Sequence, residues 1–338
     1  MADSTFAPAF TVEINGSRLS ADLARYIVDL SIVNERNSLD SLTMTLANPY
    51  PQMRWTHTDD ASMFKEGNAI KVRVGYVDQQ QPLFDGEISS VSPNFPESGM
   101  PTVGISGASW LETLRRAINT RTFLDMTDKQ IAEKIIGDAG LQADLEETTT
   151  KHPYLIQRNQ SDWKFLIDRA RLIHFEILGD GKTVKFQHVK DTQGKVATFV
   201  WGRTLKSFNP SVSRMEEVSA VVVRGYDPRT GKAIEARVGA AAVGGSATGK
   251  EEIHASSAIT TQEESDQLAQ ALFNERALAE MTGTGAVVGT PTLRAGRVIE
   301  LTGLGPRFSG SYYITQATHT INSGGYQTTF AVSRKEEE

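Results

Sequence analysis

The sequence predicts a β-rich α+β fold, in which two similar antiparallel β-barrel domains are joined by a middle region built of helices and a hairpin. Three observations support this prediction. Apolar and polar residues alternate over most of the first 115 positions, helical spacing replaces alternation between about 120 and 195, and alternating runs return after about position 200. The expected domains are residues 1–118, 119–198 and 199–338.

Alternation in the first domain is clearest in three segments, at residues 10–14, 27–33 and 42–46. Each segment places every second side chain on one face, as in a half-buried strand. The pair Asn15-Gly16 between the first two segments is typical of a turn. Residues 109–114 read as a short helix that leaves the domain.

The middle region begins with a helix whose start and end are both marked. Thr127 and Gln130 form a capping-box pattern, and Gly140 stands where a helix commonly ends. A second helix is expected from Ser161. It leads into a hairpin of residues 175–178 and 183–186, with a Gly-Asp-Gly turn between them.

The third domain is expected to contain a buried strand at residues 218–223 and a helix at 261–279, which again begins with a capping-box pattern. Residues 239–249 are rich in Gly, Ala and Ser, which is typical of a flexible loop. The last four residues, Lys335 to Glu338, are expected to be a solvated tail.

A strand-turn-strand pattern occurs twice in the chain. The first copy comprises residues 67–75, 84–88 and 102–107, and the second comprises residues 296–303, 308–314 and 326–332. Each copy opens on a glycine two or three residues before an alternating run and contains a Phe-x-Gly element. Because Gly-bounded strands are common in all-β proteins, chance similarity is the alternative explanation. If the repeat is real, one chain supplies two equivalent domains.

The repeat makes a residue-level prediction. Gly67 should superpose on Gly296, Phe84 on Phe308, and Gly86 on Gly310. Both phenylalanines should be buried, and the glycines should lie at turns or bulges where a Cβ atom is unwelcome.

Composition excludes several classes of protein. The 338 residues carry a formal net charge of −6, which argues against a nucleic-acid binder. There is no cysteine, so disulfides, thiolate metal sites and cysteine nucleophiles are excluded. The N-terminal residues do not resemble a signal peptide, and no apolar run is long enough to span a membrane, so we expect no membrane insertion.

One motif resembles a phosphate-binding loop. Residues 244–250 fit the spacing G-x-x-x-x-G-K, but Glu251 occupies the position that needs a Ser or Thr, and the next helix cap comes ten residues later. We therefore expect a mobile loop there. Residues 283–289 lack the spacing of a dinucleotide fingerprint and are expected to form a strand.

No other residues form a candidate chemical site. The six histidines occur singly, without the spacing of a metal site, and are expected to be surface or hydrogen-bonded residues. No serine-nucleophile elbow is present, and the acidic pairs are expected to be solvated. The sequence thus predicts no catalytic residue, no cofactor and no metal. Aromatic residues in alternating or helical context are expected in a core or a subunit interface: Trp163, Trp201, Phe208, Tyr312 and Tyr313.

The C-terminal segment carries a resemblance to a known family. Residues 304–314, followed by Ala317-Thr318-His319 and by residues 324–330, closely resemble the late control protein D family of contractile-tailed phages. That family forms the baseplate hub of phage tails and related contractile injection systems. It is similar to the N-terminal hub part of type VI secretion spike proteins.

The resemblance implies a structural, non-catalytic protein. Its implied form is a homotrimer of tube-type β-barrel domains that connects the hexameric tail tube to a trimeric spike, with other baseplate proteins around it. Because the sequence ends at Glu338 without a spike-like region, a separate spike protein is expected. The chain would be made in the bacterial cytoplasm and assembled into a virion tail baseplate or an injection particle. Two alternatives remain, a tail-associated cell-wall hydrolase and a carbohydrate-binding tail module.

Overall fold

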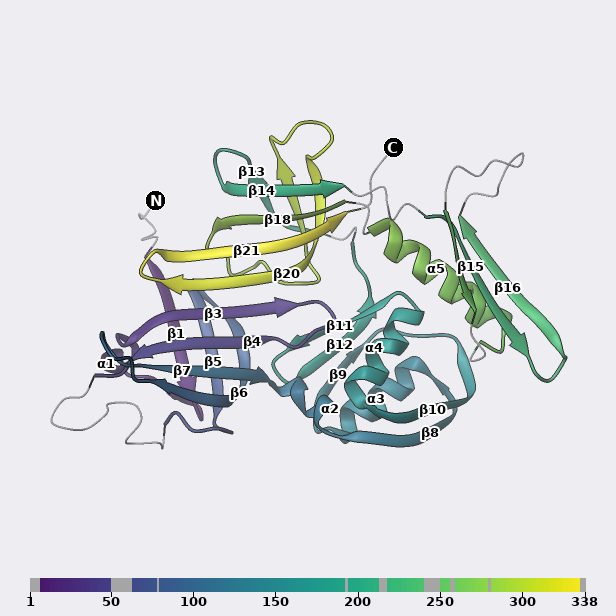
Figure 1. Ribbon diagram of the computed structural model, residues 1–338, viewed down its shortest axis with the longest axis horizontal. Coiled ribbons are helices and arrows are strands. Elements are labelled where there is room, and N and C mark those ends of the chain that lie inside the picture. The colour runs from purple at the N-terminus through teal and green to yellow at the C-terminus, as the bar shows by residue number, and fades with distance from the viewer. Residues whose placement is uncertain are drawn as a thin grey trace.

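The computed structural model describes residues 7–49, 63–77, 79–191, 194–212, 218–239, 250–255, 259–278 and 281–334. The chain forms two β modules, a middle region of helices and short sheets, and a helix that packs against a separate three-stranded sheet (Figure 1). The predicted β-rich α+β fold is confirmed.

The first module is built from six strands in the order β1-β5-β6-β7-β4-β3, all paired antiparallel. Their bounds are β1 Pro8–Ile14, β3 Ile27–Glu35, β4 Ser41–Ala47, β5 Ala69–Tyr76, β6 Gln79–Asn94 and β7 Thr102–Ser109. The short strand β2 (Ser17–Arg18) and the helix α1 (Ala21–Ala24) connect β1 to β3. Alternate residues are buried along β4 and β7, as the sequence pattern predicts.

The middle region contains two short helical segments, two longer helices and two small sheets. Its elements are η2 Trp110–Glu112, α2 Thr113–Arg116, β8 Ile118–Thr127, α3 Asp128–Asp138, β9 Gln142–Leu145, β10 Lys151–Ser161, α4 Asp162–Leu172, β11 Phe175–Asp180 and β12 Thr183–His188. The capping box of Thr127 and Gln130 is formed at α3, and Ser161 caps α4. Gly140 has a positive φ of 73°, as expected after a helix end.

The second module has strands β13 Lys195–Val200, β14 Leu205–Val212, β18 Met281–Val288, β19 Val298–Thr302, β20 Gly310–Asn322 and β21 Gly325–Arg334. Their order is β13-β19-β20-β21-β18-β14. Numbered along the chain, each module therefore has the spatial order first, fourth, fifth, sixth, third, second. One difference separates them, because β13 pairs parallel to β19 whereas β1 pairs antiparallel to β5.

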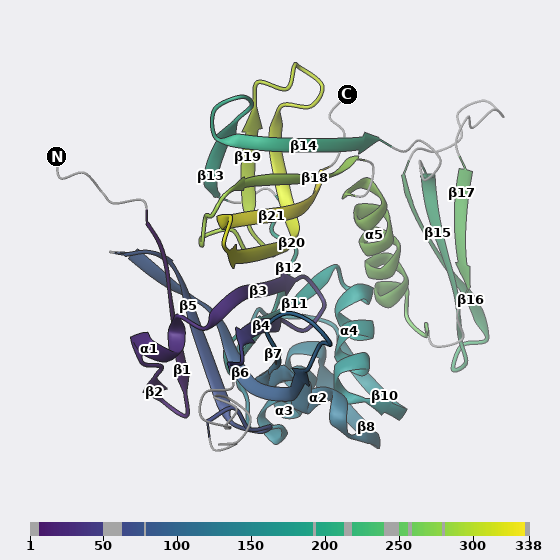
Figure 2. The same cartoon turned by 60° about the vertical axis from the view of Figure 1, so that its left-hand side comes forward.

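An inserted unit lies between β14 and β18. It consists of β15 Val218–Asp227, β16 Lys232–Gly239, β17 Lys250–Ala255 and the helix α5 Gln262–Leu278. The predicted strand at 218–223 and helix at 261–279 are both present. However, this strand belongs to the separate sheet β16-β15-β17, which α5 covers, and not to the second module (Figure 2).

The two modules share one continuous sheet. The N-terminal part of β20 pairs with β19, and its C-terminal part pairs with β3 of the first module. The core residues nevertheless form separate clusters, one of residues 12–105 together with Tyr326 of β21, one of residues 199–332, and a third in the middle region. The strand pair β3–β20 is therefore a junction between two modules, and we call it the internal junction.

Candidate functional site

The repeated glycines have the same conformation and the same hydrogen bonds. Gly67 and Gly296 have φ values of 85° and 80°. Gly67 donates its N–H to the carbonyl of Ile88 at 2.8 Å, and Gly296 donates to that of Ile314 at 3.0 Å. The return bonds, from Ile88 to Asn68 and from Ile314 to Arg297, are both 2.8 Å long. These bonds make Gly67 equivalent to Gly296 and Ile88 equivalent to Ile314.

The predicted match of the two Phe-x-Gly elements is wrong by two residues. In the first module Phe84 pairs with Val72 and Gly86 with Ile70. In the second module the equivalent partners, Leu301 and Ile299, pair with Gly310 and Tyr312. Phe84 is thus equivalent to Gly310, and Gly86 is equivalent to Tyr312.

The physical reason is that a large and a small residue exchange places along the strand. Phe84 is 2% exposed, and its ring end would lie 3.0 Å from a Cβ added at Gly86. In the second module the large side chain stands two residues later, at the fully buried Tyr312, and the small residue is Gly310 with a φ of 141°. Phe308, expected to be buried, is only partly buried at the edge of the second core.

The modules also share two β-bulges. One register shift lies between Ile88 and Ser90 of β6, against β7, and its equivalent lies between Ile314 and Gln316 of β20, against β21. The other lies between Ile27 and Asp29 of β3, against β4, and its equivalent lies between Leu205 and Ser207 of β14, against β18. A bulge bends and twists its strand and is a specific local feature. Shared strand order, glycine conformation and bulges make the repeat a duplication of structure.

The internal junction carries buried polar contacts beside its sheet. Asn34 of β3 donates its side-chain amide to Asp40 at 2.7 Å and accepts the backbone N–H of Ala295 at 2.7 Å. Tyr76 donates its hydroxyl to the carbonyl of Gly289 at 2.8 Å. Burial raises the pKa of Asp40 to about 6. One buried amide thus connects the two modules.

A second polar contact joins three parts of the chain. Glu176 of β11 forms an ion pair with Arg36, whose Nε lies 3.1 Å from Glu176 Oε2, and accepts a short hydrogen bond from the hydroxyl of Tyr313 in β20. Gln187 donates to the other carboxylate oxygen at 3.2 Å. Burial raises the pKa of Glu176. The carboxylate fixes the middle region against both modules.

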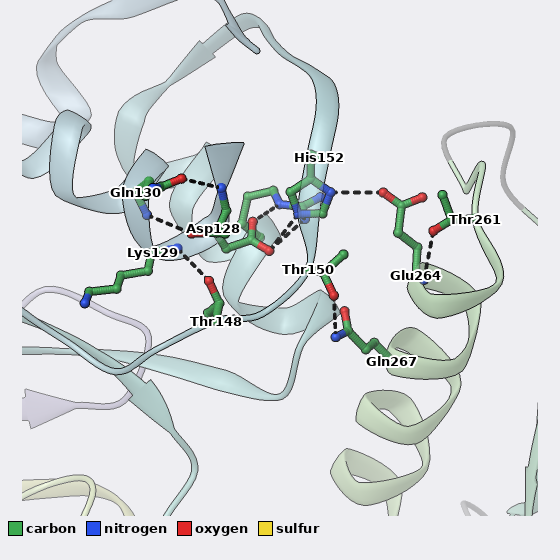
Figure 3. A network of polar contacts seen from close by, with 11 residues as sticks. Asp128, Lys129, Gln130, Thr148, Thr150, His152, Thr261, Glu264 and Gln267 are labelled. Carbon is green, nitrogen blue, oxygen red and sulfur yellow. Dashed lines mark hydrogen bonds and ion pairs between the residues drawn. The ribbon is translucent and has the colours of Figure 1, made fainter. Parts of the chain in front are cut away.

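The inserted unit is held to the middle region by a buried charged cluster around His152 (Figure 3). The ring nitrogens of His152 lie 3.0 Å from Asp128 Oδ2 and 3.0 Å from Glu264 Oε1. Arg169 donates to both oxygens of Asp128, at 2.6 and 3.0 Å. Burial alone would lower the pKa of His152, but its two carboxylate partners outweigh this effect and raise the pKa above its ordinary value.

This cluster is saturated by its own members, because each carboxylate lies within hydrogen-bonding distance of His152 and Arg169 Nη2 also lies 2.9 Å from His152 Nε2. It resembles a structural clamp more than a site that activates a substrate. Among the described residues, no group of three or more His, Cys, Asp or Glu side chains is arranged to hold a metal ion. In the same residues, no helix is long and apolar enough to cross a membrane.

The phosphate-loop motif lies mostly outside the described residues. Its Lys250 begins strand β17 and not a helix, and the next helix begins at Gln262. Gly283 and Gly285 lie in β18 against the rings of Phe208 and Phe330, in line with the close backbone packing expected for this segment. Of the five aromatic residues expected in a core or interface, four are buried and Trp201 is 50% exposed.

Solved structures similar to this chain include three bacterial proteins with phage-tail folds. The 43 kDa tail protein of prophage MuSo2 from Shewanella oneidensis matches at a TM-score of 0.77 and 13% identity, over 97% of this chain and 98% of that one. A tail protein from Neisseria meningitidis matches at 0.75 and 13%, over 97% of each chain. The Escherichia coli c3393 protein, a type VI secretion component described as similar to T4 tail proteins gp27 and gp5, matches at 0.62 and 12%, over 97% and 77%.

These matches define the class of fold as that of phage tail proteins. A family model described as the Alg8 N-terminal domain matches residues 4–323, and the chain belongs to this family. No curated protein matches the chain. The resemblance to the late control protein D family stays a prediction.

Proposed function

We propose that this chain is a structural baseplate hub protein, which connects a hexameric tail tube to a trimeric spike in a contractile phage tail or injection system. In this proposal the chain acts as a homotrimer, and its partners are the tube protein, a separate spike protein and other baseplate proteins. The domain boundaries at 118/119 and 198/199 belong to the same proposal.

The observation that carries the proposal is the duplication. A trimer of a chain with two equivalent modules presents six similar modules on one face, which suits a six-fold tube, and keeps three-fold symmetry elsewhere for a spike. The similar solved structures are tail proteins and a secretion component, which supports the same role.

The proposal includes no catalysis. A hydrolase site would require a cavity with a carboxyl group of raised pKa, and Asp40 beside a cavity of about 430 Å³ is the group that most resembles one. Yet Asp40 accepts a hydrogen bond from Asn34, which in turn binds Ala295 across the modules. This arrangement favours a structural role, and a turbidity assay on peptidoglycan should give no clearing.

The proposal is tested by assembly with partners. The full chain is mixed with candidate tube and spike proteins, and native mass spectrometry counts the subunits. We expect three copies of this chain per spike trimer. A stable monomer, dimer or hexamer in the presence of the spike would contradict the proposal. A monomer alone would not, because such rings can depend on a template.

A further inference from the structure

The internal junction provides a template for a junction between chains. Within the chain, β3 of the first module pairs with the C-terminal half of β20 of the second module. The equivalents of these two strands are β14 and the C-terminal half of β6. In the part of the chain that the structure describes, β14 lies at the end of the sheet, and residues 90–94 of β6 pair on one side only, with β7.

The equivalence can be followed residue by residue across each module. In the first module one row of paired residues runs Ser90, Ser106, Thr43, Ser31. In the second module the equivalent row runs Gln316, Ala331, Thr284, Asn209. Every side chain in both rows is uncharged. At the internal junction Ser31 pairs with Thr320, and Thr320 is the equivalent of Asn94.

From this correspondence we infer that β14 of one copy pairs antiparallel with residues 90–94 of β6 in the next copy, with Asn209 opposite Asn94. The inference rests on the proposed trimer and specifies its contact. The partner is a second copy of this chain, because its contact repeats a junction that the chain already makes internally. Asn209 and Asn94 are both exposed in the single chain.

The register of the internal junction also fits ring closure. The row that starts at Ser90 reaches Thr320, the equivalent of Asn94, after four strands, so each module shifts the register by four residues. If every junction repeats this step, each module adds four strands and a register shift of four residues to the ring. The number of strands and the shear number of the closed ring are then equal. That ratio, familiar from eight-stranded barrels, gives a strand tilt of about 36° and a closed barrel.

One difference makes the junction between chains weaker than the internal one. Arg36 donates its N–H to the carbonyl of Thr315 at 2.9 Å. Because hydrogen-bonded pairs alternate along antiparallel strands, Ile32 and His319 form such a pair two steps further along. Their equivalents are Pro210 and Pro93, and neither has an N–H to donate.

The two prolines remove both hydrogen bonds at the centre of the proposed junction. Proline on an edge strand also protects a free sheet edge from uncontrolled pairing. The two free edges of the single chain, β14 and residues 90–94 of β6, therefore pair weakly. The ring should close only when three copies are held together. The prolines make assembly depend on a trimeric partner.

Disulfide trapping tests the register, and the natural chain has no cysteine to interfere. Asn209→Cys and Asn94→Cys are introduced together in the full chain, which is fused at its C-terminus to a trimeric coiled coil. Opposite residues at a position without hydrogen bonds have Cα atoms about 4.5 Å apart, within the range for a disulfide. Oxidation should give covalent trimers on a denaturing gel.

Two matched pairs control the experiment. Ser31→Cys with Thr320→Cys is the equivalent pair at the internal junction and should form a disulfide within one chain, which leaves the band at the position of a single chain. Asn209→Cys with Ser92→Cys is displaced by two residues, and its Cα atoms are about 7–8 Å apart. Its yield of covalent trimer should therefore be lower by a factor of roughly ten or more. Equal yields from the matched and displaced pairs, or none from the matched pair in a tagged trimer, would overturn the inference.

A second variant tests the role of the prolines. Pro210→Ile with Pro93→His places the residues of the internal junction at the proposed one. Without the coiled coil, this variant should self-associate in sedimentation experiments at protein concentrations where the natural chain stays monomeric. Unchanged association would overturn the role of the prolines. Failure of the chain to bind tube or spike would instead contradict the proposed function.

Discussion

The two modules show how one strand arrangement is filled by different side chains. At three equivalent positions across neighbouring strands, the first module has Leu30, Met44 and Ile105, and the second has Phe208, Gly285 and Phe330. Three medium side chains are replaced by two rings over a glycine. All six positions are buried, so the two modules fill the same strand positions with different combinations of large and small side chains.

The modules also differ in what they add to the shared strands. The second module carries the inserted unit between its second and third strands, whereas the first connects the equivalent strands β3 and β4 by residues 36–40 alone. The insertion is attached to the middle region through His152 and Glu264. The duplicated strands thus form the shared sheet, and the inserted unit makes a separate contact with the middle region.

The largest expected effect distinguishes the two phenylalanines of the predicted repeat. Phe84→Ala removes a ring that is 2% exposed and leaves a cavity above Gly86 and Gly107, so the free energy of unfolding should fall by about 3–5 kcal/mol. Phe308→Ala should cost less than about 2 kcal/mol, because Phe308 is only partly buried. Urea denaturation of both variants measures the difference, and equal losses would argue against the corrected equivalence.

The stability that the His152 cluster contributes should depend on pH. His152→Gln keeps a polar group but removes the cation between two carboxylates, and should cost about 1.5–3 kcal/mol. Because folding raises the pKa of His152, its contribution is fully present below the ordinary value of 6.5 and is lost as pH rises through the folded value.

Denaturation of wild type and variant in parallel buffers tests this sign. The difference in stability should be larger near pH 6 than near pH 9. Asp128→Asn is the matched control on the partner, since folding lowers the pKa of that carboxyl and its contribution is lost as pH falls. A difference that grows toward alkaline pH would show that His152 is held neutral.

A glycine pair sharpens the comparison of the cores. A Cβ atom added at Gly283 would lie 2.6 Å from the ring of Phe208, so Gly283→Ala should cost about 1–3 kcal/mol. Gly104→Ala in the first module meets nothing nearer than 3.6 Å and should be neutral or slightly stabilising. Thermal unfolding of the two variants checks the contrast, which disappears if the core of the second module adapts freely.

The smallest effect is expected at the phosphate-loop motif. Lys250→Ala should leave ATP binding undetectable, as in the wild type, because Lys250 begins a strand and Glu251 follows it. Isothermal titration with ATP and magnesium measures both proteins. Millimolar or tighter binding that disappears in the variant would show a real nucleotide site.

Local signals in the sequence predicted local structure well. The capping residues Thr127 and Ser161 mark helices that begin one residue later, and the alternating runs mark strands, because both signals depend on neighbours in the chain. Gly67 and Gly296 have similar positive φ values, because each lies at a fixed distance before a strand.

What the sequence could not reveal depends on contacts between distant residues. The Phe-x-Gly match is misleading because the bulky side chain lies two positions later in the second module. A shift of two residues keeps the side chain on the same face of the strand but changes the sequence motif. The parallel pairing of β13 has no local signature. His152 looked isolated, because its partners Asp128 and Glu264 are 24 and 112 positions away. The one signal in the sequence was that both partners lie in the first turns of helices that begin with capping-box patterns.

The central claim is that the two modules are equivalent units of one ring, and a density map of the assembled particle tests it most directly. Electron cryomicroscopy of the chain bound to the proposed tube and spike proteins should show six similar modules from three chains, alternating first and second around the axis. The first and second modules should superpose with Gly67 on Gly296 and Ile88 on Ile314. A map with six chains in the ring, or with only one of the two modules facing the tube, would contradict the account.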